Sequence, residues 1–272
     1  MMRWRFLAVA LGAYAIGLII TLPATLVDAG LRHASDGRVR LVEAQGTLWS
    51  GTGQIEIRNM GGRTGVAKNL AWRVLPESLL RGKLVYEVEL EQAATRFPVT
   101  ISLSRIELAD ADMSWPATVL GLAVPQLAPL RLKGDVLVRV ASLSISRGGM
   151  QGNVTLQWRG AGSALTPVSP LGDYELHLKG EGAVVHASLR TLRGPLQLDG
   201  EGSWGNGHNP RFLATVRIPP QHQHELTPLL RLIAVERSEG RYELRLNLNE
   251  VRFSENSIGG PGPALRFGIR GQ

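Results

Sequence analysis

Alternation of apolar and polar residues is the feature that most constrains the fold of this chain. The run Leu84–Leu90 places four apolar side chains on one face of a strand and both glutamates on the other. Six further runs alternate in the same way: 99–103, 136–140, 154–158, 174–178, 212–218 and 242–248. Strands that are apolar on one side only are typical of antiparallel sheets with a solvated face. We therefore predict a mainly β domain built on an antiparallel sheet.

Helical signals are few and short. Pro76–Leu80 and Trp115–Leu120 each have the length of one or two helical turns. The longest candidate is His224–Glu236, in which apolar residues recur at helical spacing: Leu226, Leu229, Leu230 and Ile233. We expect these short helices to cap the sheet or to cover its edge.

A weak internal echo links the two halves of the chain. Residues 50–53, 70–72 and Tyr86 resemble residues 149–152, 156–158 and Tyr174 in order and type, although the loops differ in length. A curved, duplicated β-unit would produce such an echo. Accidental similarity among strands that are punctuated by glycine would produce it too, and the sequence leaves both readings open.

The N-terminus carries an uncharged apolar run, Phe6–Val27, of 22 residues. A helix of this length can span the ~30 Å hydrocarbon core of a bilayer. Arg3 and Arg5 precede the run, so the positive-inside rule predicts that residues 1–5 are cytoplasmic. We therefore expect a single transmembrane anchor over residues 6–27, with residues 28–272 on the other side of the membrane.

A cleaved signal peptide is the alternative interpretation of this run. Val27-Asp28-Ala29 offers compatible residues at the −3 and −1 positions of a cleavage site. However, the apolar region of a signal peptide is about 7–15 residues long, and this run is longer. Both interpretations place the bulk of the chain outside the cytoplasm.

Composition excludes several kinds of chemistry. The chain has no cysteine, which removes disulfides, thiolate metal sites and cysteine nucleophiles together. The net charge of +7 comes almost entirely from arginines that are spread singly along the chain. Nucleic-acid binding needs clustered basic residues, so this pattern favours an ordinary solvated surface.

Residues Gly200–Gly205 match the G-x-G-x-x-G pattern of dinucleotide sites by letter only. Such a site needs a helix directly after the glycines, and Asn206–Pro210 cannot form one. We expect a hairpin turn here. Ser203 is not the nucleophile of a G-x-S-x-G elbow, because position 201 is glutamate.

The remaining polar groups do not assemble into a predicted site. His222 and His224, with Glu225 beside them, have no second pair of metal ligands at suitable spacing. Asp110 and Asp112 form an isolated carboxylate pair, and four histidines stand alone: His33, His177, His186 and His208. We therefore predict no catalytic, cofactor-binding or metal-binding residues, no cofactor and no enzymatic activity. The tryptophans are expected in the core or on the sheet face: Trp49, Trp72, Trp115, Trp158 and Trp204.

The most specific block of the chain is Val42–Gly51, read as a strand, a Gly-Thr turn and a strand that bears Trp49. Together with the preceding anchor, this block resembles the type II secretion system protein N family (general secretion pathway protein N). Leu229-Leu230 followed by Gly240–Leu244 is also similar to the end of that family. We expect Trp49 to be buried against the sheet in a structural role.

The resemblance implies an accessory inner-membrane component with a periplasmic β-rich domain. Such a component assists the export of folded proteins from the periplasm across the outer membrane by protein–protein contacts. The implied partners are other inner-membrane type II secretion components and the outer-membrane secretin, with membrane lipid contacted through the anchor. We expect the sheet edges to bind partners, and the candidate edges are Val39–Val42 and Leu265–Ile269.

One alternative function belongs to a different class. A membrane-anchored periplasmic protein of the AsmA-like or bridge type binds lipid in a groove formed by an antiparallel sheet. It shares the anchor and the one-sided strands with this chain. This alternative requires a concave sheet face that is apolar and uncovered.

Overall fold

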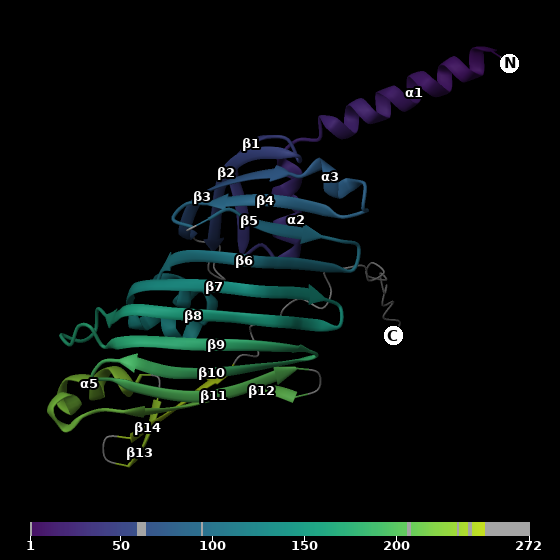
Figure 1. Cartoon of the computed structure of the whole chain (residues 1–272). Helices are drawn as coiled ribbons and strands as arrows, with labels where there is room; N and C mark the ends of the chain where they lie inside the picture. The colour runs from purple at the N-terminus through teal and green to yellow at the C-terminus, as the bar shows by residue number, and fades with distance from the viewer. Residues whose placement is uncertain are drawn as a thin grey trace, which may run out of the picture.

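A single antiparallel sheet of 14 strands forms the body of the protein (Figure 1). This computed structural model describes residues 2–58, 64–93, 95–205, 208–232, 234–238 and 241–247. The strands follow one another across the sheet in sequence order, except that β14 lies between β12 and β13. The prediction of a mainly β, antiparallel domain with few short helices is confirmed.

The strands vary from five to fifteen residues, and the longest pair, β7 and β8, lies in the middle of the sheet. Their bounds are β1 (Val39–Gly46), β2 (Ser50–Arg58), β3 (Thr64–Val74), β4 (Leu84–Leu90), β5 (Phe97–Ile101), β6 (Arg105–Pro116), β7 (Leu132–Ser146), β8 (Gly149–Ser163), β9 (Gly172–Gly182), β10 (Val184–Arg193), β11 (Gln197–Gly205), β12 (His208–Arg217), β13 (Ala234–Ser238) and β14 (Arg241–Asn247).

The helices lie before the sheet and in its connections. Their bounds are α1 (Met2–Ile20), α2 (Thr25–Ala34), α3 (Pro76–Leu79), α4 (Thr118–Ala123), η1 (Pro125–Leu130), η2 (Pro220–His222) and α5 (Gln223–Leu230). The helix α1 projects away from the body (Figure 1). No helix among the described residues is both long enough and apolar enough to cross a bilayer.

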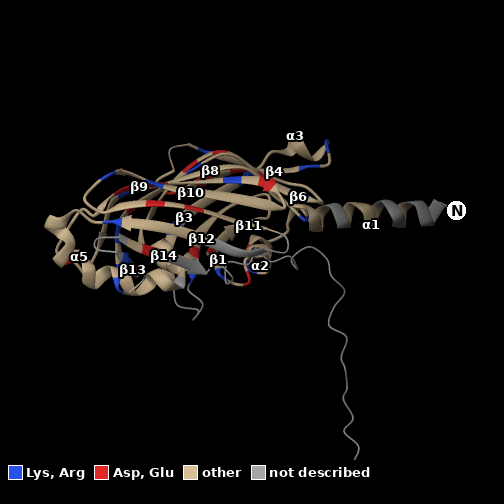
Figure 2. Cartoon of the chain, turned by 90° about the horizontal axis from the view of Figure 1, so that it is seen from below, with Lys and Arg blue, Asp and Glu red and all other residues tan. Residues whose placement is uncertain are grey.

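The two faces of the sheet differ in chemistry because side chains alternate along each strand. In β9, Tyr174 is buried on the apolar face, whereas Glu175, His177 and Lys179 point to the opposite, polar face. The sheet curves, and α2 and α5 lie on the side toward which it curves (Figure 2). The apolar face is therefore the inner face, and the polar face is the outer one.

The core lies on the inner face and is divided into three apolar clusters. Near the C-terminal end, α5 buries Leu226, Leu229 and Leu230 against residues of β12 and β14 such as Val216 and Tyr242. A second cluster joins the middle strands, and a third packs α2 against the inner face of β1, β3 and β4. The helices α2 and α5 thus cover the two ends of the curved sheet, and α4 and η1 pack against the apolar clusters between them.

The third predicted helix is shorter in the structure than the sequence indicates. The helix α5 ends at Leu230, and Ala234–Glu236, which the sequence predicts as the end of this helix, lie in β13 (Ala234–Ser238) beside β14. The buried leucines all lie in α5, so the apolar spacing that stabilises the helix ends with Leu230. The short helix at Pro76 is confirmed as α3, whereas Trp115 belongs to β6 and its helix begins only at Thr118.

The predicted hairpin is present, because β11 and β12 pair antiparallel with Gly205 opposite His208. Gly200–Gly205, however, lie in strand β11 and not in the turn. The glycines leave room for a close neighbour: a Cβ added at Gly200 would lie 2.8 Å from the Cβ of Ala214 in β12. Gly202 lies opposite Phe212 of β12, whose large side chain is buried. The glycines therefore serve packing between strands and not the conformation of a turn.

The internal echo does not correspond to a duplicated unit. In the first half, residues 50–53 and 70–72 lie on two neighbouring strands, β2 and β3. In the second half, residues 149–152 and 156–158 both lie on β8. The matching letters therefore occupy different positions in the sheet.

Candidate functional site at the helix–sheet junction

The segment between α1 and α2 is hydrogen-bonded to the turn that joins β1 and β2. The Leu48 N–H donates to the Leu22 carbonyl at 2.8 Å, and the Ala24 N–H donates to the Gly46 carbonyl at 3.3 Å. Pro23 and Thr47 lie opposite each other in an isolated antiparallel bridge. The segment Leu22–Ala24 is thereby paired with the turn between β1 and β2, at the end of the sheet.

Trp49 connects this turn to the end of α1. Its indole Nε1–H donates to the carbonyl of Ile19 at 2.8 Å. The last carbonyls of a helix have no partner within the helix, so this bond satisfies one of them. The Trp49 carbonyl accepts the Val74 N–H of β3 at 2.6 Å, so Trp49 joins the helix to the sheet.

The expectation that Trp49 is buried is not met, because its side chain is only half-buried in the structure. Trp72 is the buried tryptophan of the junction, and its Nε1–H donates to the Thr47 carbonyl at 3.2 Å. The role that we predicted for Trp49 in the core therefore belongs to Trp72. Trp49 itself positions the helix.

Two glycines allow this close packing. Gly46 has a φ of +97°, a conformation that L side chains rarely adopt, and a Cβ there would lie 2.5 Å from the Ser50 carbonyl oxygen. A Cβ at Gly51 would lie 2.5 Å from the ring of Trp72. The residue types of the block Gly46–Gly51 are thus explained by the geometry of the junction.

The helix α2 covers the outer edge of β1. The Val39 N–H donates to Ser35 Oγ at 2.9 Å, and the Leu41 N–H donates to Asp28 Oδ1 at 2.9 Å. β1 is an edge strand as predicted, but these N–H groups already have partners within the chain. The expectation that Val39–Val42 receives a partner strand is therefore wrong. The other expected edge, Leu265–Ile269, lies outside the described residues.

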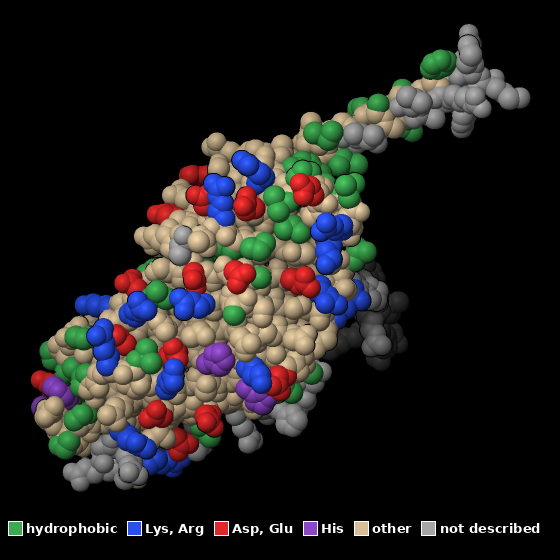
Figure 3. Space-filling model, in the orientation of Figure 1, with side chains coloured by type: hydrophobic (Ala, Val, Ile, Leu, Met, Phe, Trp, Pro, Cys, Tyr) green, Lys and Arg blue, Asp and Glu red, His purple; other side chains and the backbone are tan. Residues whose placement is uncertain are grey.

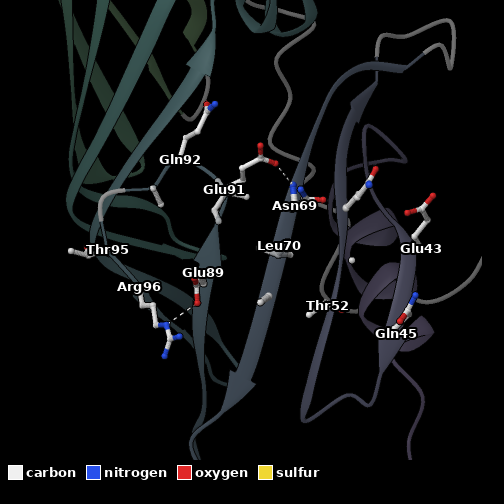
Figure 4. A pocket seen from close by; sticks show the side chains of 15 residues that line it. Glu43, Gln45, Thr52, Asn69, Leu70, Glu89, Glu91, Gln92, Thr95 and Arg96 are labelled. Atoms are coloured by element: carbon white, nitrogen blue, oxygen red, sulfur yellow. Dashed lines mark hydrogen bonds and ion pairs between the residues drawn. The ribbon is translucent and has the colours of Figure 1, made fainter.

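A polar pocket of about 770 Å³ lies beside the junction, between β1 and the turn after β4. Figure 4 shows Arg96 pointing toward Glu89 and Glu91 pointing toward Asn69. Arg96 Nε donates to Glu89 Oε2 at 2.8 Å, and the Asn69 N–H donates to Glu91 Oε2 at 3.0 Å. Glu43 lines the opposite side at a bulge of β1, where its φ is +51°. With three carboxylates and one guanidinium, the pocket would attract a cationic group.

Lys68 fixes the turn after β4 from the inner face. Its buried Nζ donates to Gln92 Oε1 at 2.7 Å and to the Glu91 carbonyl at 3.1 Å, and it lies 5.4 Å from the ring centre of Trp115. Burial lowers the pKa of the Lys68 ammonium, an effect that Glu91 and Asp135 partly oppose. The ladder between β5 and β6 has only three residue pairs, and Lys68 reaches across this short seam.

The outer face carries carboxylates that are held by hydrogen bonds. Asp173 Oδ1 accepts the Gly160 N–H at 2.7 Å, and its Oδ2 accepts a hydrogen bond from Arg193. The Gly160 bond is the main cause of the lowered pKa of Asp173, and Arg193 adds to it. The pKa of Glu175 is also lowered, first by Gln157 and then by Arg190. Their hydrogen-bond partners thus stabilise the ionised carboxylates of Asp173 and Glu175 on the polar face.

The isolated polar residues noted in the sequence stay apart in the structure. His222 Nδ1 lies 3.4 Å from Glu225 Oε2, while His224 is exposed. Asp110 lies in β6 with a φ of +49°, and Asp112 pairs with Arg139 at 2.9 Å. Among the described residues, no group of three or more His, Asp or Glu side chains is placed to hold a metal ion.

Comparison with known proteins places most of the chain in one family. The family model for type II secretion system (T2SS), protein N, matches residues 37–245. The matched segment begins just before β1, ends within β14 and contains the whole block around Trp49. No curated protein and no solved structure matches the chain.

Proposed function

The chain belongs to the type II secretion system protein N family, and on that premise we propose that it assists the export of folded proteins as an inner-membrane component. In this proposal its contribution is to bind and position other components of the system, and not to catalyse a reaction. The observation that carries the proposal is the junction of α1 with the sheet. A domain that is tied to its helix at Leu22, Ala24 and Trp49 has a defined orientation relative to that helix.

We propose that α1, which carries the first part of the apolar run Phe6–Val27, inserts into the inner membrane. The run has no charged residue, and Arg3 and Arg5 before it favour a cytoplasmic N-terminus. Phe6, Leu11 and Tyr14 are exposed on α1, where the body of the protein does not cover them. The sheet then lies in the periplasm, where the exported proteins fold.

The strand β13 is the edge that we propose for partner binding. Its ladder joins β14 alone, and no strand within the described ranges pairs with its other side. Val235 on this strand is 59% exposed, so its apolar side chain is open to contact with a partner. An extended segment of a partner could add to this edge through main-chain hydrogen bonds.

A secretion assay tests the role of the junction. Cells that lack the chain should accumulate folded exported proteins in the periplasm, and the full chain should restore their export. A Gly-Gly-Ser insertion between Thr21 and Leu22 would separate α1 from the sheet and should restore export poorly at a normal protein level. The same insertion after Arg147, in the turn between β7 and β8, should restore it fully.

Two results would count against the proposal. Normal export without the chain would remove it from the secretion process altogether. Full export with the insertion at Thr21 would show that a fixed orientation of the sheet is not needed, even if the chain is a component of the system.

One observation favours the lipid-binding alternative as a second candidate function. On the inner face of β7, β8 and β9, the apolar side chains Val138, Leu156 and Leu176 are only half-buried. If the middle of the sheet binds acyl chains, native mass spectrometry of the detergent-solubilised protein should detect phospholipid. Replacing Leu156 and Leu176 by Asn should then reduce the lipid-bound fraction.

A further inference from the structure

Three leucines are exposed around the short helix α3. Leu75, Leu79 and Leu80 are 40%, 43% and 92% exposed, although they lie within six residues of one another. Single exposed leucines are common on protein surfaces and need no explanation. A group of them on one loop indicates a surface that meets another apolar phase.

This loop lies at the base of α1. Ile19 at the end of α1 accepts the indole N–H of Trp49, and the Trp49 carbonyl accepts the N–H of Val74, which directly precedes Leu75. Figure 1 shows α3 on the side of the sheet from which α1 leaves. Figure 3 shows apolar side chains gathered there, at the base of α1. Leu18, Ile19 and Ile20 continue the exposed apolar surface along the helix.

Two basic residues follow the leucines. Arg81 and Lys83 are exposed, and neither forms an ion pair with an acidic side chain of the described chain. Glu77 is the only acidic residue between Leu75 and Lys83. Apolar side chains beside basic ones suit the boundary between acyl chains and anionic headgroups.

The loop is held in this shape by its own hydrogen bonds. The Leu75 N–H donates to the Val85 carbonyl at 2.9 Å, and the Lys83 N–H donates to the Ser78 carbonyl at 3.2 Å. Ser78 Oγ donates to the Leu75 carbonyl at 2.6 Å and accepts the Val85 N–H at 3.2 Å. The leucines are therefore presented by an ordered loop, which lowers the entropic cost of binding.

We propose that the loop Leu75–Lys83 is a second membrane contact of this protein. Leu79 and Leu80 enter the interfacial region of the bilayer that holds α1, and Arg81 and Lys83 bind its anionic phospholipid headgroups. The inference rests on the proposed anchoring by α1. With two contacts on one bilayer, the sheet is restrained in tilt as well as in position.

The absence of cysteine makes a direct test available. Leu80→Cys in the full chain provides a unique site for an environment-sensitive fluorophore. The labelled protein is reconstituted in vesicles of phosphatidylethanolamine and phosphatidylglycerol. The label should show blue-shifted emission and should be quenched by spin-labelled phospholipid.

Two matched labels separate this inference from the anchoring on which it rests. Leu11→Cys reports on α1, and Val235→Cys reports on β13, at the end of the sheet opposite α1 (Figure 1). If lipid quenches the Leu11 label while the Leu80 label behaves like the Val235 label, the anchor stands and the second contact is refuted. An unquenched Leu11 label would instead refute the anchoring itself.

The basic residues have their own test. Each basic residue near an anionic surface contributes roughly 1 kcal/mol to membrane binding. Arg81→Gln with Lys83→Gln should therefore lower the equilibrium constant for insertion of the Leu80 label by roughly 30-fold. Vesicles without phosphatidylglycerol should give the same loss in the unchanged loop. A Leu80 label that remains in water in vesicles, but is shielded by added inner-membrane secretion components, would assign the loop to a protein partner and overturn the proposal.

Discussion

At the scale of single residues, the tryptophans of the junction have separate roles. Trp72 is buried and fills the space beside Gly51, whereas the half-buried Trp49 bonds to the end of α1. The sequence identified the block Val42–Gly51 but not the different roles of the two tryptophans. The partner of Trp49 is Ile19, thirty residues away, and no local pattern encodes such a contact.

The two tryptophans should therefore respond differently to substitution. Trp72→Ala removes a large buried ring and should lower the free energy of unfolding by about 3–5 kcal/mol. Trp49→Phe keeps an aromatic ring but loses one hydrogen bond, which should cost about 0.5–1.5 kcal/mol. Denaturant unfolding of both variants measures the difference. Equal losses would mean that the junction does not separate packing from helix positioning in this way.

Asp173 provides a prediction on pH. Its pKa is lower in the folded protein than in the unfolded chain, so its ionised form stabilises the fold above the unfolded pKa of about 3.9. That contribution is lost as the pH falls through the lower folded pKa. The unchanged protein should therefore lose more stability between about pH 5 and pH 2 than Asp173→Asn does. Parallel losses in the two proteins would show that Asp173 is not a stabilising carboxylate.

At the scale of elements, α2 determines which edge of the sheet is available. Removing Asp28 with Ser35 should leave the Leu41 and Val39 N–H groups unpaired at the edge of β1. An exposed strand edge promotes pairing with a second copy. Asp28→Ala with Ser35→Ala should thus form dimers in analytical ultracentrifugation of the detergent-solubilised chain. Glu77→Ala, which also removes a carboxylate, should remain like the unchanged protein.

Because the edge of β1 is already bonded to α2 and Ser35, Val42→Pro does not test a binding edge. By the alternation of the ladder, Val42 directs its main-chain groups toward β2, where Gln54 is its partner. A proline at Val42 would therefore break the β1–β2 ladder within the chain. Assembly defects in that variant would report on folding and not on a binding edge.

Glycines in β11 provide a second prediction at the scale of elements. A Cβ at Gly200 would lie 2.8 Å from the Cβ of Ala214, so Gly200→Ala should cost about 1–3 kcal/mol of stability through overpacking. Gly30 in α2 has no atom within 4 Å of an added Cβ, so Gly30→Ala should stabilise the helix by about 0.5–1 kcal/mol. Thermal unfolding of the two variants should shift in opposite directions. A stabilised Gly200→Ala protein would contradict the packing that we describe.

At the scale of the whole molecule, the β fold was predictable, and the positions of its ends were not. The run Leu84–Leu90 alternates except at Val85, and its predicted bounds equal those of β4. β11 was missed as a strand because Gly200 and Gly202 remove the apolar side chains that would mark its inner face. The sequence predicts helix for Ala234–Glu236, because the strand character of β13 depends on pairing with β14, which the local sequence does not record.

Part of the site was also predictable, because its residues are recognisable in the sequence although their contacts are not. The block Gly46–Gly51 and the uncharged run before it could both be recognised in the sequence. Their connection through Leu22, Ala24 and Trp49 is visible only in the folded chain. The apolar run also continues past α1 into α2, which begins at Thr25 and packs on β1, so its composition does not mark where α1 ends.

The central claim is that this chain assists secretion by contacting other inner-membrane secretion components through its sheet. The most direct test places a photocrosslinking residue at Val235 on β13 in the full chain, in cells that are exporting protein. We predict covalent adducts with other inner-membrane secretion components and far fewer adducts from the same residue at Leu192 on β10. Normal export with no such adduct at Val235, or equal adducts at Leu192, would contradict this account.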